Sequence, residues 1–280
     1  MDQKVAVVTG SSSGIGFETA LLLSRTGFYT YATMRNMSKA NHILQITEKE
    51  RLPLQALQLD VNDDESVKNA VNQIAKEKQR IDILVNNAGF LLIGCVEDLS
   101  IDEFKAQYET TLFGVIRVTR SILPYMRNQK QGMIVNVSSA AGRIAVPTVP
   151  AHSSAKFALE GLSEALKYEV EPFGIKVVII EPGVIKTNIL NASITAAKAQ
   201  DPKSPYAQMM QKVITRFSSF FENAPLPIEV AKVILKAITA ENPETRYLVG
   251  DDAITMVQAR KKMSDAEFER LWKSNILEPE

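Results

Sequence analysis

The chain has 280 residues, 45% of them hydrophobic, which is enough for one large domain with a substantial core. Its 32 basic and 32 acidic side chains balance and no basic block stands out, so no nucleic-acid partner is expected. No stretch is long and apolar enough to span a bilayer, and the first residues, MDQKVAVVTG, lead into a strand without a signal-peptide pattern. The single cysteine, Cys95, excludes an internal disulfide and suits a reducing compartment, so we expect a cytoplasmic protein with no membrane partner.

Short β-branched segments alternate with longer helical segments along the chain. The pattern predicts, in order, a strand at 4–10, a helix at 14–27, a strand at 28–34, a helix at 39–50, a strand at 54–61 and a helix at 63–79. It continues with a strand at 81–89, a helix at 101–127, a strand at 132–139, a helix at 152–171 and a strand at 175–183. The last predicted elements are a helix at 228–239, a strand at 245–250 and a helix at 265–276.

This alternation indicates βαβ units, whose strands form a parallel sheet covered by helices on both faces. We therefore predict an α/β fold, with one domain over residues 1–280 built on a doubly wound parallel sheet of about seven strands. The weakly patterned residues 188–226 are expected to form a variable lid over a substrate pocket. Residues 252–280 are expected to form a C-terminal helical extension.

The sequence TGSSSGIG, Thr9 to Gly16, follows the first strand and opens the first helix. Gly10 permits a tight turn, Gly14 lets the backbone approach a pyrophosphate, and Gly16 allows the helix to pack closely on the strand. Free N–H groups and partial positive charge at the helix N-terminus favour a phosphate. In this context the loop predicts a dinucleotide site, whereas glycines alone are also typical of an ordinary strand end.

Four motifs together resemble the short-chain dehydrogenase/reductase family. They are the loop T-G-x-x-x-G-I-G, NNAG at 86–89, NVSS at 136–139 and PGVIKT at 182–187, each after a predicted strand. The ordered resemblance runs from about residue 4 to 187 and continues more loosely to 250. It implies a Rossmann-type fold, a nicotinamide cofactor and a homo-oligomer, a dimer or tetramer that pairs through residues 101–127 and 152–171 or near the last strand.

The resemblance also implies which positions bind the cofactor. They are Gly10, Ser11, Ser13, Gly14, Ile15 and Gly16 at the phosphates and ribose, Asp60 and Val61 at the adenine, Asn87, Ala88, Gly89 and Lys156 at the ribose, and Pro182, Gly183 and Thr187 at the nicotinamide. At the end of the second strand, where a carboxylate would favour NAD, Met34 is followed by Arg35. A guanidinium suits the 2′-phosphate of NADP, so NADP is predicted over NAD. The alternative is that Arg35 is an ordinary solvated arginine.

The family's catalytic group of Asn, Ser, Tyr and Lys is only half present. Ser139 and Lys156 match, but His152 stands at the tyrosine position and Thr111 at the asparagine position. His152 and Lys156 lie four residues apart on one helical face, so the ammonium and burial should both depress the pKa of the imidazole. We expect ordinary carbonyl reduction to suffer, because a neutral imidazole is a better base than acid.

A second chemistry is suggested by Cys95, which lies six residues after Gly89 in a loop that lines the family's substrate pocket. A thiol facing an imidazole is the minimum for nucleophilic catalysis, with Thr111, Ser138 and Ser139 as hydroxyl donors to an oxyanion. We therefore predict an engineered or repurposed scaffold in which a Cys95–His152 dyad hydrolyses small apolar or aromatic esters. That reaction needs no cofactor and leaves the NADP site vestigial.

Two alternatives remain open at this point. One is an NADP-dependent oxidoreductase with impaired or altered reduction of a small apolar or aromatic carbonyl compound. The other is a non-catalytic NADP-binding protein. Cys95 taken alone is more typical of a small buried apolar residue. We predict no metal site.

Overall fold

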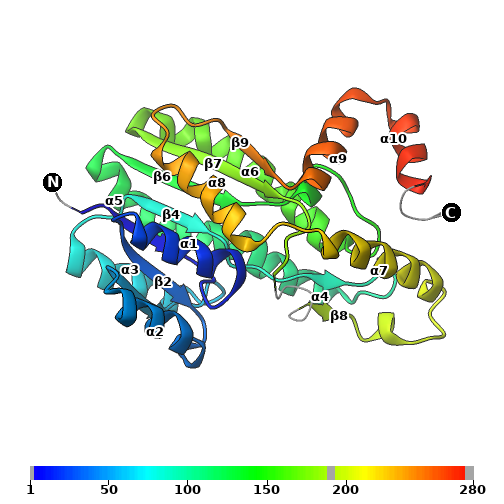
Figure 1. The fold of residues 1–280 in the computed structure, drawn as a ribbon, viewed down its shortest axis with the longest axis horizontal. Coiled ribbons are helices and arrows are strands. Elements are labelled where there is room, and N and C mark those ends of the chain that lie inside the picture. The colour runs from blue at the N-terminus through cyan, green and yellow to red at the C-terminus, as the bar shows by residue number, and fades with distance from the viewer. Residues whose placement is uncertain (1–2, 188–192, 275–280) are drawn as a thin grey trace.

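The structure is a computed structural model that describes residues 3–187 and 193–274. Its main sheet has seven parallel strands in the order β3-β2-β1-β4-β6-β7-β9, with helices on both faces (Figure 1). The strands are β1 (Val5–Val8), β2 (Tyr29–Met34), β3 (Leu54–Gln58), β4 (Ile83–Asn86), β6 (Gly132–Val137), β7 (Ile175–Pro182) and β9 (Arg246–Val249). The predicted doubly wound, Rossmann-type α/β fold is confirmed.

Both faces of the sheet are covered, and the central strands β1, β4 and β6 are buried at every position. Val5, Ala6, Val7 and Val8 of β1 are all buried, as β-branched strands between two helical layers must be. One layer contains α1 (Gly14–Arg25), α2 (Asn41–Glu50) and α8 (Pro227–Thr239). The other contains α3 (Asp64–Lys78), α5 (Gly114–Gln129) and α6 (Pro150–Val170).

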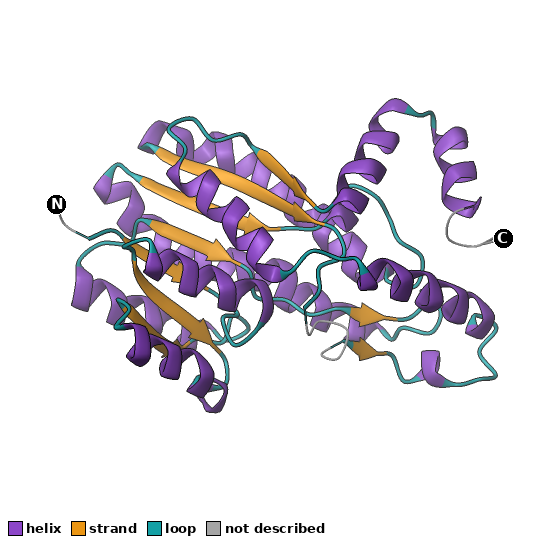
Figure 2. Cartoon of the chain, in the orientation of Figure 1, coloured by secondary structure: helices purple, strands orange, loops and turns teal. Residues whose placement is uncertain are grey.

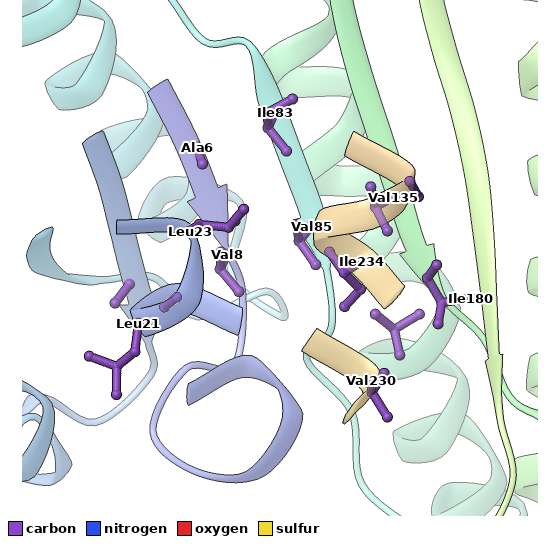
Figure 3. Packing of buried hydrophobic residues seen from close by; sticks show 14 of the residues in the cluster. Ala6, Val8, Leu21, Leu23, Ile83, Val85, Val135, Ile180, Val230 and Ile234 are labelled. Atoms are coloured by element: carbon purple, nitrogen blue, oxygen red, sulfur yellow. The ribbon is translucent and has the colours of Figure 1, made fainter. Parts of the chain in front are cut away.

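Alternate residues of each strand contribute to the two layers. On the α1 and α8 side, Val8, Val85 and Ile180 pack with side chains of those helices, such as Leu21 and Ile234 (Figure 3). On the opposite side, the neighbouring residues of the same strands pack against α3, α5 and α6. Since both clusters extend over several strands, the position of each strand end is fixed from both faces.

The strand order reverses between β1 and β4, which are direct neighbours although β2 and β3 come between them in the chain. In sheets of this kind ligands bind beyond the carboxyl ends of the strands at the point of reversal. The loops that follow β1 and β4 both begin at this place. They are the glycine loop at 9–16 and the NNAG segment at 86–89.

The helix predicted without a break over 101–127 is interrupted. It consists of α4 (Ile101–Tyr108), a π-helical turn η2 (Glu109–Phe113) and α5. Ser100 caps the N-terminus of α4 with a capping box. Its hydroxyl accepts from the backbone N–H of Glu103, and the Glu103 carboxylate accepts from the backbone N–H of Ser100. A π-helical turn inserts one extra residue into the ladder and is frequent at functional sites, and this one contains Thr111.

Elements beyond the main sheet lie near the carboxyl ends of its strands. A two-stranded sheet of β5 (Leu92–Ile93) and β8 (Ile194–Thr195) lies there with α7 (Ala207–Glu222), and neither strand was predicted (Figure 2). Helices α9 (Asp251–Lys262) and α10 (Asp265–Trp272) follow the last strand. Parts of the predicted lid, 188–192, and of the predicted extension, 275–280, lie outside the described residues. No helix within the described ranges has the length and apolar character needed to cross a membrane.

Candidate active site

The glycine loop forms a cradle between β1 and α1. Gly10 has φ +69°, and a Cβ built there would lie 2.8 Å from the Cα of Ala88, so only glycine fits. A Cβ at Gly16 would lie 2.5 Å from the carbonyl oxygen of Gly10. Ser13 precedes α1 in an extended conformation without a side-chain cap, and the first turn holds no acidic residue. The N–H groups of that turn therefore remain available to an anion, and the loop fits a pyrophosphate.

Thr9 and Asn87 fasten this loop to the end of β4. The hydroxyl of Thr9 accepts from the backbone N–H groups of Asn87 and Ala88 at 3.0 and 3.1 Å. The Asn87 amide donates to the carbonyls of Thr9 and Gly10 at 2.9 and 3.2 Å. Ser11, one of the predicted cofactor contacts, donates its hydroxyl to the carbonyl of Val8 at 2.8 Å and is buried.

Three other predicted cofactor positions lie in or near the loop. Ile15 packs against the apolar cluster on the α1 side. Thr187 lies beside the loop, since a Cβ at Gly14 would be 3.5 Å from its side chain. Gly89 follows the partly buried Ala88 and is exposed after β4.

Arg35 lies at the exposed end of β2, directly after buried Met34. Within residues 3–187 and 193–274 its guanidinium has no hydrogen-bond or ion-pair partner. After the neighbouring strand β3, Asp60 accepts from the N–H of Asn62 at 3.0 Å, and Val61 is buried. A cation without a partner therefore borders the region where the resemblance places the adenosine half of the cofactor.

The loop after β7 is held by the C-terminal part of the chain. The hydroxyl of Ser139 donates to the carbonyl of Pro182 at 3.3 Å, and the N–H of Gly183 donates to the carbonyl of Val249 at 2.8 Å. The carboxylate of Asp252, on α9, accepts from the N–H of Val184 at 2.7 Å. Sequence reasoning did not identify Asp252, because no motif connects it with a loop some 70 positions earlier.

Lys156 is buried on α6, and its Nζ donates to the carbonyl of Val137 at 2.7 Å. Burial lowers the pKa of its ammonium to about 8, although the carboxylate of Glu160, one helical turn later, acts in the opposite direction. The group is therefore still a cation at neutral pH, and it loses its proton much more readily than a solvated lysine.

His152 lies one turn before Lys156 on the same helix. Burial, and then the Lys156 ammonium, lower the pKa of the imidazole to about 3, while a backbone hydrogen bond with Phe90 raises it. Its Nδ1 is shielded from solvent and has no hydrogen-bond partner among the described residues. The ring is therefore neutral at physiological pH, as the sequence predicted, and it is a far weaker base than the dyad hypothesis required.

Thr111 is buried in the π-helical turn, and its hydroxyl accepts from the amide of Gln107 at 2.7 Å. Gln107 itself is fully buried, and its place beside Thr111 was not predicted from the sequence. A polar residue four positions before Thr111 shares its helical face, and this was the one signal in the sequence that pointed to Gln107.

Cys95 does not form the predicted dyad. Burial, with the nearby Asp98 carboxylate, raises the pKa of its thiol. No hydrogen bond joins it to His152 in the described part of the chain. The neighbouring acids have structural partners: Glu97 accepts from the hydroxyl of Tyr206 at 2.8 Å, and Asp98 accepts from the hydroxyl of Ser204 at 3.1 Å. No group of three or more His, Cys, Asp or Glu side chains that could hold a metal occurs among the described residues.

Comparisons with known proteins cover nearly the whole chain. A family model described as short chain dehydrogenase matches residues 4–198. The chain is 34% identical over 267 residues to oxidoreductase BOA17 of Botryotinia fuckeliana, covering 95% of this chain and 96% of that one. It is 30% identical over 283 residues to an NADPH-dependent 3-dehydrocapnine reductase of Ornithobacterium rhinotracheale, covering 98% and 97%. A short-chain dehydrogenase structure from Streptomyces avermitilis superposes with TM-score 0.84 at 31% identity, covering 98% and 97%.

These comparisons overturn the predicted esterase. Natural oxidoreductases match the chain along its length, so the prediction of an engineered or repurposed scaffold with a hydrolytic Cys95–His152 dyad is wrong. The physical reasons are the raised pKa of the Cys95 thiol, which reduces the thiolate available, and the low pKa of His152, which leaves little driving force for proton abstraction.

We predict that Cys95 reacts slowly in the native protein. Because the thiol is buried and its pKa is raised, alkylation by iodoacetamide at pH 7.5 should be at least roughly tenfold slower than in the urea-unfolded chain. Mass spectrometry over time measures both rates on the single cysteine. Equal alkylation rates in the native and unfolded protein would contradict the conclusion that the thiol is buried and unactivated.

His152 should make the fold sensitive to acid. Its pKa lies below that of an unfolded histidine, so the unfolded chain binds the extra proton and stability falls as pH drops from about 6.5 toward 3. Between pH 6.5 and 4.5 the free energy of unfolding should fall by about 2–3 kcal/mol more in the wild type than in His152→Gln. Urea titrations of both proteins at the two pH values measure this difference, and parallel losses would refute it.

Proposed function

Because the chain belongs to the short-chain dehydrogenase family, a family of oxidoreductases, we propose that it is an NADP-dependent oxidoreductase that reduces a small apolar carbonyl compound. The observation that carries this proposal is the glycine cradle at the N-terminus of α1 with the unpaired Arg35 beside it. The relative named an NADPH-dependent 3-dehydrocapnine reductase supports both the cofactor and the direction of the reaction.

In this proposal the cofactor extends along the carboxyl ends of the strands. Its pyrophosphate would bind the N–H groups of Ser13, Gly14, Ile15 and Gly16, with Gly10 and Ser11 shaping the turn. The remaining contacts would be Asp60 and Val61 at the adenine, Asn87, Ala88, Gly89 and Lys156 at the ribose, and Pro182, Gly183 and Thr187 at the nicotinamide. Arg35 would pair with the 2′-phosphate, because a guanidinium binds phosphate in a bidentate manner.

The proton for the product hydroxyl would come from Lys156. A bound reduced nicotinamide supplies a hydride to the carbonyl carbon. His152 carries no positive charge at neutral pH, so it can orient a substrate but is not a cationic acid. Lys156 holds a proton at Nζ with a pKa of about 8, close to working pH, as an efficient general acid requires. The Ser139 hydroxyl, whose bond to Pro182 is long at 3.3 Å, is free to turn toward a carbonyl oxygen.

An apolar substrate is proposed from the surroundings of the site. Leu92, Leu99, Ala151 and Ala196 form a buried cluster, and Phe90 and Phe104 pack against it. Ala151 directly precedes His152, so the cluster adjoins the candidate catalytic helix. An apolar wall with a few polar groups is the usual lining of a small-molecule site.

We also propose a homo-oligomer that pairs through residues 101–127 and 152–171. Phe113, Phe157 and Tyr168 are large apolar side chains at 48%, 45% and 71% exposure on these segments. Exposed apolar groups gathered on neighbouring helices are typical of protein interfaces. A monomeric mass in analytical ultracentrifugation would contradict this proposal.

Arg35 provides the test of cofactor choice. Arg35→Ala should weaken NADPH binding about tenfold to a hundredfold, the value of a charged hydrogen bond, and leave NADH binding unchanged. Fluorescence titration measures both affinities. The control is Lys49→Ala, which removes an exposed cation from the neighbouring helix α2. Equal or tighter binding of NADH by the wild type would defeat the proposal.

The pH dependence of reduction tests the proton donor. The Lys156 ammonium is present below its pKa and lost above it, so kcat/KM should be constant below pH 8 and then fall about tenfold per pH unit. If Lys156 were solvated, kcat/KM would begin to fall only at about pH 10. No limb should appear near pH 6.5, because His152 is already neutral there.

The assay is the oxidation of NADPH with a panel of apolar ketones and aldehydes. Binding of NADPH without turnover of any of them would leave a non-catalytic NADP-binding protein. A limb at pH 6.5 would make His152, and not Lys156, the proton donor.

A further inference from the structure

Thr148 has an unusual backbone conformation. Its φ is +68°, in the left-handed region that β-branched residues rarely adopt. The other non-glycine residues with positive φ in the described part of the chain each close a helix at its C-terminus, where this conformation is common: Arg51, Gln79 and Lys130. Thr148 instead lies two residues before Pro150, where α6 begins, and it is buried. Its conformation is therefore imposed by contacts with the rest of the protein.

The sequence favours a turn at this place, but not a threonine within it. Pro147 and Thr148 form a turn before α6. Proline followed by a residue with positive φ is the pattern of a type II turn, in which the second of these residues is ordinarily glycine or asparagine. A threonine at that position is strained, and an asparagine would relieve the strain.

The carbonyl of Thr148 bonds to a segment on the other side of the candidate site. It accepts from the N–H of Gly94 at 2.7 Å. Gly94 directly follows β5, and a Cβ built on it would lie 3.1 Å from the Cβ of Ala196 and 3.1 Å from the Leu99 side chain. The bond therefore reaches the apolar wall of the candidate site, which consists of Leu92, Leu99, Ala151 and Ala196.

The same turn is bonded to the first turn of α6. The N–H of Val146 donates to the Ser153 hydroxyl at 3.3 Å, and the N–H of Ser153 donates to the carbonyl of Val149 at 2.9 Å. Ser153 directly follows His152. The strained turn thus lies between the end of α6 that carries His152 and the segment after β5, with hydrogen bonds to both.

We propose that Thr148 is a positioning residue whose left-handed backbone fixes the apolar wall at Gly94 against the His152 end of α6. A negative φ would turn the carbonyl away from Gly94, and the wall would be free to move away from the helix. A substrate would then fit less closely beside His152. This effect on the substrate rests on the proposed function, whereas the positioning of the wall does not.

Amide hydrogen exchange at Gly94, measured by nuclear magnetic resonance, tests the positioning without cofactor or substrate. Thr148→Pro fixes φ at about −65°. It removes no donor in use, because the Thr148 N–H donates no hydrogen bond within residues 3–187 and 193–274. The Gly94 amide should exchange about tenfold faster, the value of one lost hydrogen bond. Unchanged exchange of Gly94 in folded Thr148→Pro would overturn the proposal.

Thr148→Asn keeps the proposal testable if the proline variant does not fold. Asparagine tolerates the left-handed conformation, so this variant should keep the slow exchange of Gly94 and melt about 2–5 °C higher than the wild type. The matched control is Thr119→Asn, because Thr119 is equally buried but lies in the regular helix α5. It should melt lower than the wild type, since it has no strain to relieve and a larger side chain must fit a packed site. A lower melting temperature for Thr148→Asn, or fast exchange of Gly94 in that variant, would contradict the strained turn.

Turnover separates this inference from the proposed function. With an apolar ketone, Thr148→Pro should raise the KM for the ketone about tenfold and leave the KM for NADPH unchanged, because the apolar wall moves and the glycine cradle does not. An unchanged KM for the ketone would overturn the effect on the substrate. If the wild type reduces no carbonyl compound, the proposed function fails and the exchange of Gly94 alone decides the inference.

Discussion

The burial of the Lys156 ammonium is the constraint on which the chemistry of the site depends. A cation held by one neutral carbonyl and screened from water acts strongly on its neighbours. A phenol at position 152 would ionise more easily beside it, because the phenolate is an anion. The imidazole at the same position ionises less easily, first because it is buried and then because its charged form is a cation beside the Lys156 ammonium. Burial and this neighbouring charge together make the histidine at position 152 a neutral hydrogen-bonding ring.

The position of that charge is fixed by the sheet behind it. Glu160, on the same helix as Lys156, pairs with Arg246 of β9 at 3.0 Å, and Arg246 also meets Glu181 of β7 at 3.1 Å. Both carboxylates are buried, and Glu181 also pairs with Arg143 at 3.0 Å, so removal of Arg246 would leave the buried Glu160 carboxylate without its ion-pair partner. The helix that carries the site is therefore held to the sheet by paired charges as well as by apolar packing.

The parts of the molecule that sequence could predict are those encoded locally. The glycine loop at 9–16 and the alternating strands and helices could be predicted from short stretches of sequence. Their backbone conformation and burial follow from residue types at fixed spacing. The helix over 101–127 was predicted without a break, since a π-helical turn changes the hydrogen-bond ladder but not the apolar pattern. Gln107 was missed because a buried glutamine looks like any polar helix residue until its partners on another segment are known. The predicted pairing of Cys95 with His152 was wrong for the same reason. Two residues that border the same pocket need not lie within bonding distance or face each other.

The contact between Asp252 and the N–H of Val184 has a consequence for where this domain ends. The matched family model stops at residue 198, yet the loop after β7 takes one of its backbone partners from a helix that begins only at residue 251. The stretch after the last strand is thus not a detachable appendage. A cut at residue 250 would preserve every strand and the bond from Gly183 to Val249, but it would remove the carboxylate that accepts from Val184.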